Sequence, residues 1–285
     1  MLAPGVVISL LFVYIPLMGS VMAFQKYNPL LGFFKSPWIG FDNFRFIANL
    51  PGTFQVIWNT IYIAMLKIIG GIIVPLTFAL LLNEITRSKV KRVFQTFIYI
   101  PNFISWIILA GIFREILSPT SGIVNKGLML LGFEPIFFLG DVFWFPLTMV
   151  LTDIWKSFGF GTVIYLAALT NINPELYESA MIDGAGRWKQ TFHITIPGIM
   201  PIIILMSVLA LGNVLNAGFD QIFNMYSPVV YSTGDVIDTF IYRLGLEQRQ
   251  YSPATAVGLF KSAVSFLFVS LSYILADKLA NYRIF

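Results

Sequence analysis

The chain of 285 residues is 57% hydrophobic and only 11% charged, with a net charge of +4. Soluble domains carry about a quarter charged residues, so this composition and the mean hydropathy of +0.80 exclude a soluble protein and predict an integral membrane protein. With no cysteine and one histidine, the sequence excludes disulfides and thiolate metal sites and does not favour a histidine-built zinc site. The redox compartment stays undetermined.

The first segment, residues 1–24, carries no charge and is long enough to cross a hydrocarbon core of about 30 Å. A secretory signal peptide is the alternative, but the segment has no basic start, its apolar run is too long and no small-residue cleavage pattern follows it. We therefore predict a first membrane span. Residues 25–50 are polar, with prolines, glycines and aromatic residues, which predicts an extended external loop at the membrane interface.

Two further spans are predicted on either side of a basic loop. Residues 54–82 are apolar apart from Lys67. Residues 84–92 carry four basic residues and one acid, and loops of that kind face the cytoplasm. Residues 93–113 contain no charge. Pro101 and Asn102 within them predict a kink or a break in that span.

The C-terminal half holds three more predicted spans. In the first of them, Asp153 and Lys156 lie three residues apart on one helical face, where they can pair with each other. The predicted spans cover residues 142–170, 194–219 and 254–276, the external segments cover residues 114–141 and 220–253, and a short tail carries Lys278 and Arg283.

The expected fold class is all-α, because long apolar runs rather than short alternating segments dominate and exclude a closed barrel. We expect one polytopic membrane domain over residues 1–285, with six transmembrane helices. The basic loop places both termini, and the polar loop at about residues 171–196, in the cytoplasm.

The loop at residues 171–196 is the polar, small-residue-rich stretch between two long apolar segments, and we call it the central loop. Asn173 suits a helix N-cap and Pro174 suits the first helical position. Gly184 is a natural helix stop. We therefore predict a short helix over residues 174–183.

One face of that short helix is almost free of side chains, because Ala180 and Gly184 lie at positions i and i+4. Another surface can therefore approach it closely. A second short helix is predicted over residues 187–193, and Pro197 is expected to separate it from the next span.

The spacing of residues in the central loop forms a specific motif. In chain order it consists of Glu178-Ser179-Ala180, three residues, Gly184, nine residues and Ile194-x-Ile196-Pro197. It resembles the cytoplasmic motif of permease subunits of bacterial ABC importers, Glu-Ala-Ala-x3-Gly-x9-Ile-x-Leu-Pro, and departs from it at Ser179 and Ile196. An ordinary interfacial loop helix with a glycine stop is the structural alternative.

Other segments are similar to carbohydrate-uptake permeases of the maltose and glycerol-phosphate type. Among these the chain most resembles the branch that imports uronic-acid oligosaccharides such as alginate and aldouronate. The similar segments are residues 95–101, 172–177, 235–243 and 256–262. The resemblance implies the type I ABC importer permease fold in the bacterial inner membrane. It also implies three kinds of partner: a second homologous permease, two cytoplasmic ATPase subunits and an extracytoplasmic solute-binding protein.

The chain itself is not expected to be an enzyme or to hold a cofactor. It has no Gly-x4-Gly-Lys-Ser/Thr phosphate loop, so ATP and Mg are expected to bind to the separate ATPase subunits. The resemblance implies that the first short helix of the motif is the coupling helix, seated in a cleft of the ATPase. The residues expected to take part in this coupling are Glu178, Ser179, Ala180, Asp183, Gly184, Arg187 and Pro197.

The substrate path is predicted from polar and aromatic side chains inside the spans. Ionisable residues in spans are costly and are candidates for function, and lysines that face a cavity suit an anionic sugar. The candidates are Lys67, Trp106, Asp153, Trp155 and Lys156. In the structural alternative, Asp153 and Lys156 only neutralise each other and the tryptophans are packing or interfacial residues.

Three other functions stay open at this point. The first is import of neutral rather than acidic oligosaccharides. An ion-driven secondary transporter or a channel is the second, although the chain shows neither an internal repeat nor charged relays in several spans. A membrane enzyme is the third, but catalytic residue types do not converge on one predicted face.

Overall fold

The computed structural model of the chain describes residues 2–85 and 87–280. Over these residues the chain is helical, with one isolated antiparallel bridge between Gln25 and Trp38 and no sheet. The helices are α1 (Ala3–Ser9), α2 (Ile15–Leu17), α3 (Gly32–Lys35), α4 (Asp42–Asn49), α5 (Thr53–Asn83), α6 (Ser88–Phe103), α7 (Trp106–Ile116), α8 (Ile123–Leu130), α9 (Trp144–Leu169), α10 (Glu175–Ile182), α11 (Arg187–Gln190), α12 (Ile196–Leu211), α13 (Phe219–Met225), α14 (Tyr231–Gly234), α15 (Ile237–Tyr242) and α16 (Tyr251–Ala280). The predicted all-α fold is confirmed.

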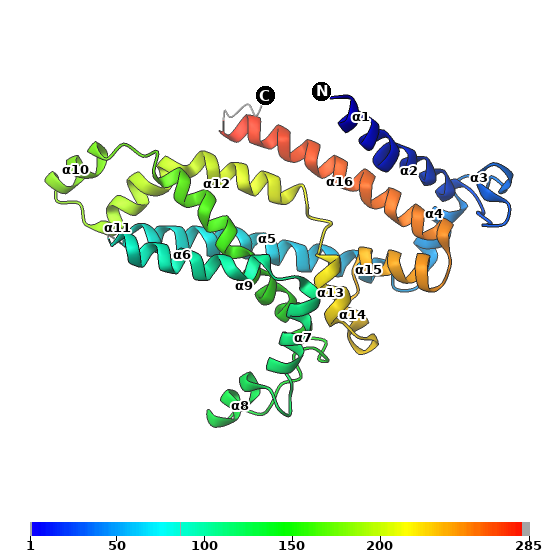
Figure 1. The fold of residues 1–285 in the computed structure, drawn as a ribbon, viewed down its shortest axis with the longest axis horizontal. Helices are drawn as coiled ribbons and strands as arrows, with labels where there is room; N and C mark the ends of the chain where they lie inside the picture. The colour runs from blue at the N-terminus through cyan, green and yellow to red at the C-terminus, as the bar shows by residue number, and fades with distance from the viewer. Residues whose placement is uncertain (1, 86, 281–285) are drawn as a thin grey trace.

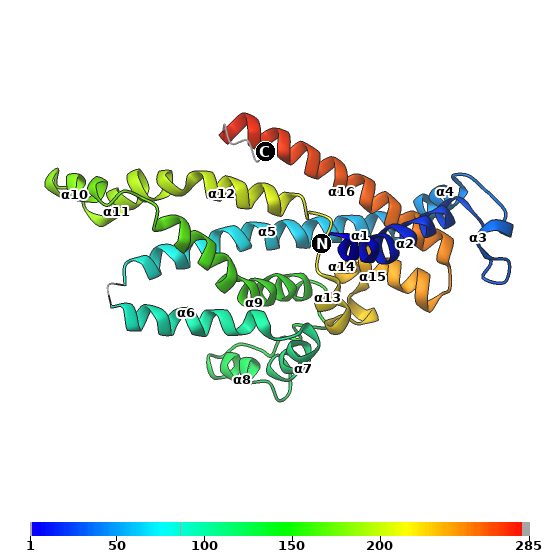
Figure 2. The same ribbon diagram turned by 45° about the horizontal axis from the view of Figure 1, so that its top comes forward.

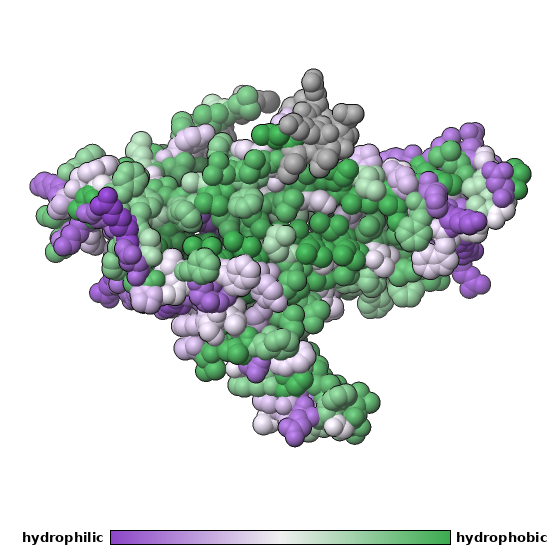
Figure 3. Space-filling model, turned by 180° about the vertical axis from the view of Figure 1, so that it is seen from behind, coloured by the Kyte–Doolittle hydropathy of each residue, from purple (hydrophilic) through white to green (hydrophobic). Residues whose placement is uncertain are grey.

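The helices are arranged along one long axis (Figure 1). α10 lies at one end of this axis, and α3 and α4 lie at the other end. α5 runs along the long axis, α6 and α12 lie in the half towards α10, and α16 starts near α4 and runs towards the α10 end, while α7 and α8 project from the side (Figure 2). In Figure 3 apolar side chains cover the middle of the molecule and polar side chains gather at its two ends. An apolar band of this kind fits the hydrocarbon core of a bilayer.

Four helices within residues 2–85 and 87–280 are long and apolar enough to cross a membrane. They are Ala3–Phe24, Thr53–Asn83, Arg187–Leu211 and Tyr251–Ile274. The pair α6 and α7 makes a fifth if it counts as one span. α9, with 26 residues, has the length of a span but is less apolar because it contains Asp153 and Lys156. The count of six therefore stays a prediction that depends on α9 and on the α6–α7 pair.

The third predicted span is sharply bent. α6 and α7 meet at 102°, and the bend lies at Ile104 and Ser105, whose backbones are extended. The kink expected near Pro101 is confirmed, since the helix ends within one turn of this proline. The side chain of Ser105 caps the new helix by accepting a hydrogen bond from the backbone N–H of Ile108 at 3.4 Å.

Pro197 does not separate two helices as predicted. α11, the π-helical turn Thr191–Thr195 and α12 form one continuous helix, Arg187–Leu211. A proline inside an α-helix clashes with the carbonyl group four residues earlier. Here Pro197 lies in the first turn of α12, directly after the π-helical turn, and the wider turn accommodates the ring.

The fifth predicted span ends earlier than expected. Its charge-free run continues to Phe219, but α12 ends at Leu211 and residues 212–218 are not helical. Gly218 has φ +92°, a left-handed conformation that favours glycine. A charge-free run predicts burial in lipid, and it does not reveal a break whose backbone groups find partners inside the bundle.

The external segments are more ordered than predicted. Residues 25–50, expected to be extended, contain α3 and α4, and residues 220–253 contain α13, α14 and α15. Asn43 of α4 is buried and donates from its side-chain nitrogen to the carbonyl oxygens of Ala23 (2.8 Å) and Gln25 (3.0 Å). This buried amide fixes the first external segment on the end of the N-terminal helix.

Glycine contacts let the central helices approach closely. A Cβ atom on Gly159 of α9 would stand 1.9 Å from the carbonyl oxygen of Ile98 in α6. One on Gly70 of α5 would stand 2.1 Å from the side chain of Ile154 in α9. Small residues at helix contacts are the usual means of tight packing in lipid. α9 therefore packs directly against both α5 and α6.

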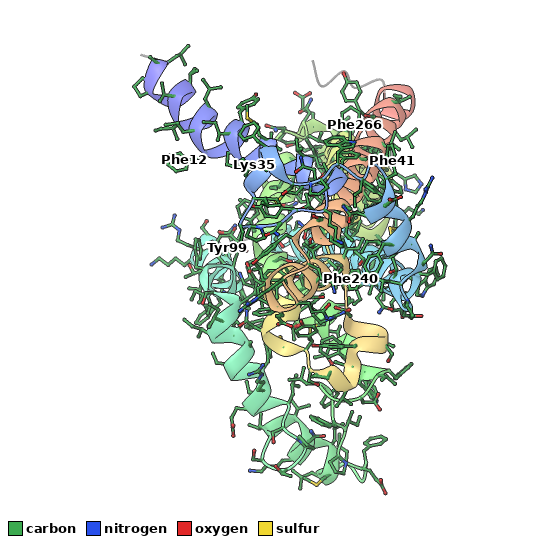
Figure 4. The ribbon with its side chains drawn as sticks, turned by 90° about the vertical axis from the view of Figure 1, so that its right-hand side faces the viewer. Phe12, Lys35, Phe41, Tyr99, Phe240 and Phe266 are labelled. Atoms are coloured by element: carbon green, nitrogen blue, oxygen red, sulfur yellow. The ribbon has the colours of Figure 1, made fainter. Side chains whose placement is uncertain are left out.

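The first and the last described helices lie at the edge of this bundle. The last part of the N-terminal helix, Met18–Phe24, packs on α16. Phe12 points away from the bundle in Figure 4 and is 75% exposed. Arg283 and the side chain of Lys278, from the predicted basic tail, lie outside the described part of the chain.

Candidate functional site

The central loop forms the short helix that its sequence predicts. α10 covers Glu175–Ile182, inside the predicted range of residues 174–183. The side-chain oxygen of Asn173 accepts from the backbone N–H of Glu175, and its amide nitrogen donates to the Glu175 carboxylate, both at 3.1 Å. Asn173 thus satisfies one of the free N–H groups at the start of the helix, as its sequence position indicates.

Gly184 ends α10 in a left-handed conformation, with φ +77°. The backbone N–H of Gly184 donates to the carbonyl of Met181 at 3.1 Å, and that of Ala185 donates to the carbonyl of Ala180 at 2.8 Å. This pair of bonds is the Schellman ending, which requires the left-handed residue. A Cβ atom on Gly184 would meet nothing within 4 Å, so the glycine is required by its backbone angle.

Most side chains of α10 are exposed. Among its apolar residues, Ile182 is 87% exposed, Met181 59% and Leu176 51%. Glu178, Ser179 and Asp183 are exposed as well, and Ala180 is half-buried. An exposed surface that combines apolar and acidic side chains at the end of a membrane bundle has the composition of a protein docking site.

Hydrogen bonds join the central loop to two of the long helices. The hydroxyl groups of Tyr177 and Thr195 lie 3.0 Å apart and link α10 to the helix that continues into α12. Arg187 pairs with Glu84, at the end of α5, with Nη1 and Oε2 3.0 Å apart. Tyr177 thus joins α10 to the helix that continues into α12, and Arg187, at the start of that same helix, joins it to α5.

A buried lysine stands at the middle of the bundle. Nζ of Lys67 in α5 donates to the carbonyl oxygen of Ala217 at 2.7 Å and to the side-chain oxygen of Gln221. It also lies 3.5 Å from the Asp153 carboxylate of α9. Gln221 is fully buried and donates its amide to the carbonyl of Met149 at 2.8 Å and to Thr152 at 2.7 Å. This network joins α5, α9 and the start of α13.

A cavity of about 350 Å³ lies beside this network. Its charged lining residues are Lys67 and Asp153, which pair with each other, so its wall is close to neutral. Asn213 and Asn216 also line it, from the non-helical residues 212–218, and their side chains are exposed. Exposed amides can donate to and accept from sugar hydroxyl groups.

Sequence reasoning missed Asn213 and Asn216. The signal was present, because two amides and two glycines within residues 212–218 interrupt an otherwise apolar run. Such an interruption in a span marks irregular backbone, which is tolerated where it lines a cavity.

The remaining three candidates for the substrate path lie together at another place. Nζ of Lys156 donates to the carbonyl of Asn102 at 2.8 Å and stands 5.6 Å from the ring centre of Trp106. Trp155 packs edge-on against Phe113 of α7, with ring centres 5.6 Å apart. These contacts surround the bend between α6 and α7, where Lys156 satisfies a carbonyl group freed by the break.

The predicted pairing of Asp153 with Lys156 is wrong. Asp153 pairs with Lys67, while Lys156 turns to the α6–α7 bend. Residues three apart on a helix differ by about 60° in direction, and α9 packs between α5 and α6. The two side chains therefore reach different neighbours.

The chain is similar to known transport proteins over its whole length. Residues 68–281 match the family described as binding-protein-dependent transport system inner membrane component. Protein LplB of Bacillus subtilis (strain 168) is 42% identical over 278 residues, which are 98% of this chain and 87% of LplB. The polygalacturonan/rhamnogalacturonan transport system permease protein YteP of the same organism is 39% identical, over 100% of this chain and 89% of YteP.

A solved structure has the same fold. A crystal structure of a bacterial alginate ABC transporter, in complex with an alginate pentasaccharide-bound periplasmic protein, contains a chain that matches with a TM-score of 0.91 at 37% identity. The match covers 100% of this chain and 95% of that one. The resemblance that the central-loop motif indicated is confirmed. The family match over residues 68–281, together with these relatives, shows that the chain belongs to the binding-protein-dependent transport system inner membrane components.

Proposed function

We propose that this chain is a permease subunit of an ATP-driven importer that carries acidic oligosaccharides into the cytoplasm. The observation that carries the proposal is the exposed motif helix α10, which Tyr177 ties to the helix that continues into α12. That helix is tied to α5 by Arg187, and both helices line the cavity. Acidic oligosaccharides as the substrate class are supported by two similar proteins. YteP is named for polygalacturonan/rhamnogalacturonan transport, and the solved transporter is named for alginate. Neutral oligosaccharides are the second candidate, supported by AraP of Bacillus subtilis, named for arabinooligosaccharides, at 29% identity.

The coupling role rests on the shape and exposure of α10. We propose that Glu178, Ser179, Ala180, Asp183 and Gly184 contact an ATPase subunit, with the apolar side chains of α10 entering its cleft. ATP hydrolysis then belongs to that separate subunit. Arg187 and Pro197 lie outside the docked helix and hold its orientation, the first through Glu84 and the second at the start of α12.

The orientation in the membrane follows from charge. Residues 84–92 carry the strongest basic bias in the chain. The end of α5 and the start of α6 lie at the same end of the bundle as α10 (Figure 1). The positive-inside rule places that end in the cytoplasm. The N-terminal helix Ala3–Phe24 leads to α3 and α4 at the opposite end, and α16 leads away from that end. This direction of the two helices supports the proposal that both termini face the cytoplasm. We propose one domain, residues 1–285, which includes the coupling loop.

The substrate path of this subunit is the cavity beside Lys67. Asn213, Asn216 and Asp153 offer amide and carboxylate groups that suit sugar hydroxyl groups. Because Lys67 and Asp153 neutralise each other, this half of the path attracts an acidic sugar only weakly. Selection for charge then belongs to the second permease and to the solute-binding protein. Trp106, Trp155 and Lys156 support the path indirectly by fixing the α6–α7 bend.

Uptake into proteoliposomes tests this proposal. The complex of this chain with its partner permease, ATPase subunits and binding protein is compared with the same complex without the ATPase subunits, on oligouronates and on neutral oligosaccharides. ATP-dependent uptake chiefly of oligouronates supports the acidic importer. ATP-dependent uptake of neutral sugars alone contradicts the substrate class, and uptake without the ATPase subunits contradicts the importer class.

A further inference from the structure

The seven non-helical residues between α12 and α13 border the cavity, and Val214, Leu215 and Ala217 among them are buried. Backbone polar groups at such a place need partners within the protein, because the hydrocarbon core offers none. Some of these backbone groups find a partner within the segment, since the N–H of Asn216 donates to the carbonyl of Asn213 at 2.8 Å. The carbonyl of Ala217, at the end of the segment, accepts from Nζ of Lys67.

The ammonium group of Lys67 makes two hydrogen bonds and one ion pair. An ammonium group has three donors, and its neighbours are the Ala217 carbonyl at 2.7 Å, the Gln221 side chain and the Asp153 carboxylate at 3.5 Å. The side chain of Lys67 is 8% exposed, whereas that of Asp153 is 29% exposed. Lys67 therefore points its charge into the protein although it borders the cavity.

The backbone around Gly218 is shaped to admit this ammonium group. A Cβ atom on Gly218 would lie 3.1 Å from Nζ of Lys67, and the residue has φ +92°. The next contact, Gln221, is fully buried and is held by α9 through Met149 and Thr152. The network thus fixes both the end of the segment and the first turn of α13 to α5 and α9.

From this geometry we propose that Lys67 is a positioning residue that clamps residues 212–218 in their non-helical form, so that Asn213 and Asn216 face the cavity. Lys67 is not a contact for the charge of the substrate. This inference rests on the proposed function, in which the cavity is the substrate path. The competing explanation is that Lys67 only neutralises Asp153, and it makes different predictions for a double variant.

Cysteine labelling separates the two explanations, because the natural chain contains no cysteine. In the assembled complex that carries Asn216→Cys, we measure the rate at which a thiol reagent labels this chain. Lys67→Met and the double variant Lys67→Met/Asp153→Asn are compared. The clamp predicts that both change the labelling rate by about tenfold, the size expected for loss of a charge-assisted hydrogen bond. A double variant that labels at the unsubstituted rate overturns the proposal.

A second variant keeps the charge pair intact. Gln221→Leu removes the link to α9 but leaves Lys67 facing Asp153, and the clamp predicts a similar change in labelling. An unchanged rate in Gln221→Leu contradicts the clamp.

The control is Lys261→Met/Asp238→Asn, which removes another lysine–aspartate pair, 2.5 Å apart on α16 and α15. Its labelling at position 216 should stay unchanged, and an equal change there would show that any lost ion pair has this effect.

The labelling test stays informative if the proposed function fails. Protection of the introduced cysteine by oligosaccharide reports whether the cavity is the substrate path. If protection is absent but the Lys67 and Gln221 variants still alter labelling, the clamp is supported and the assignment of the path is wrong. If protection is present and these variants have no effect, the path is supported and the clamp is wrong.

Discussion

Arg187 in the central loop forms an ion pair with Glu84 at the end of α5, with Nη1 and Oε2 3.0 Å apart. Both side chains are largely exposed, so the pair contributes only about 0–1 kcal/mol to stability. Its position matters more than its energy, because it joins the motif loop to a helix that lines the cavity. A coupling element needs such links, since it acts only through contacts that differ between two states.

Reversing the charge of Arg187 should weaken coupling without unfolding the chain. We expect Arg187→Glu to lower the stimulation of ATP hydrolysis by loaded binding protein, because the new carboxylate repels Glu84. The thermal unfolding temperature should change little for so exposed a pair. The double variant Glu84→Arg/Arg187→Glu should restore stimulation, and a double variant as poor as the single one would show that Arg187 acts elsewhere.

Removing the hydroxyl group of Tyr177 should loosen the link between α10 and α12. Tyr177→Phe breaks the bond to Thr195, and a neutral hydrogen bond contributes about 1 kcal/mol. We expect ATP-driven uptake to fall about fivefold, with assembly intact. Thr195→Val should have the same effect, and the two changes together should cost no more than one. Additive losses would mean that the two hydroxyl groups act independently.

The contact of Gly159 with α6 should tolerate no side chain. Gly159→Ala would place Cβ 1.9 Å from the carbonyl of Ile98, so the helices must separate. Overpacking of this kind costs about 1–3 kcal/mol, and a lower unfolding temperature of the purified protein measures it. Gly71→Ala is the matched control, since a Cβ atom there meets nothing within 4 Å. An equal loss in both variants would contradict the packing explanation.

The amides at the cavity should determine affinity for the sugar. Asn213→Ala and Asn216→Ala each remove hydrogen-bonding groups that face the cavity, and we expect the apparent KM for oligosaccharide uptake to rise about tenfold. Asn49→Ala, an exposed amide of α4, is the control. A KM that is unchanged in both cavity variants would move the substrate contacts to the second permease.

Local signals in the sequence were sufficient for the motif helix. Asn173 and Gly184 fixed its two ends, because a capping amide and a left-handed glycine act on their own neighbours and need no tertiary context. The prediction that Pro197 ends a helix was wrong. The effect of a proline depends on the turn before it, and here that turn is π-helical and the helix continues through it. The four most apolar spans were predicted for the same reason as the motif helix, as length and hydropathy are local properties.

Partners inside the bundle could not be predicted in this way. Asp153 has Lys156 three residues away, yet it pairs with Lys67, 86 positions distant (153 − 67), because packing decides which neighbour each side chain reaches. The break at residues 212–218 is different, because its two amides and two glycines mark it in the sequence. What the sequence does not reveal is that a lysine from another helix satisfies the Ala217 carbonyl at the end of this segment.

In the proposed function α10 transmits ATP-driven motion to the spans, and Gly184→Leu tests this role most directly. Gly184 has φ +77°, where a side chain costs roughly 1–2 kcal/mol and disturbs the end of the helix. Gly186→Leu is the control, because Gly186 has φ −68°, which any residue adopts. We predict that complexes with Gly184→Leu insert into the membrane but lose ATPase docking and ATP-dependent uptake, while Gly186→Leu retains both. Normal uptake with Gly184→Leu would contradict the coupling role of α10.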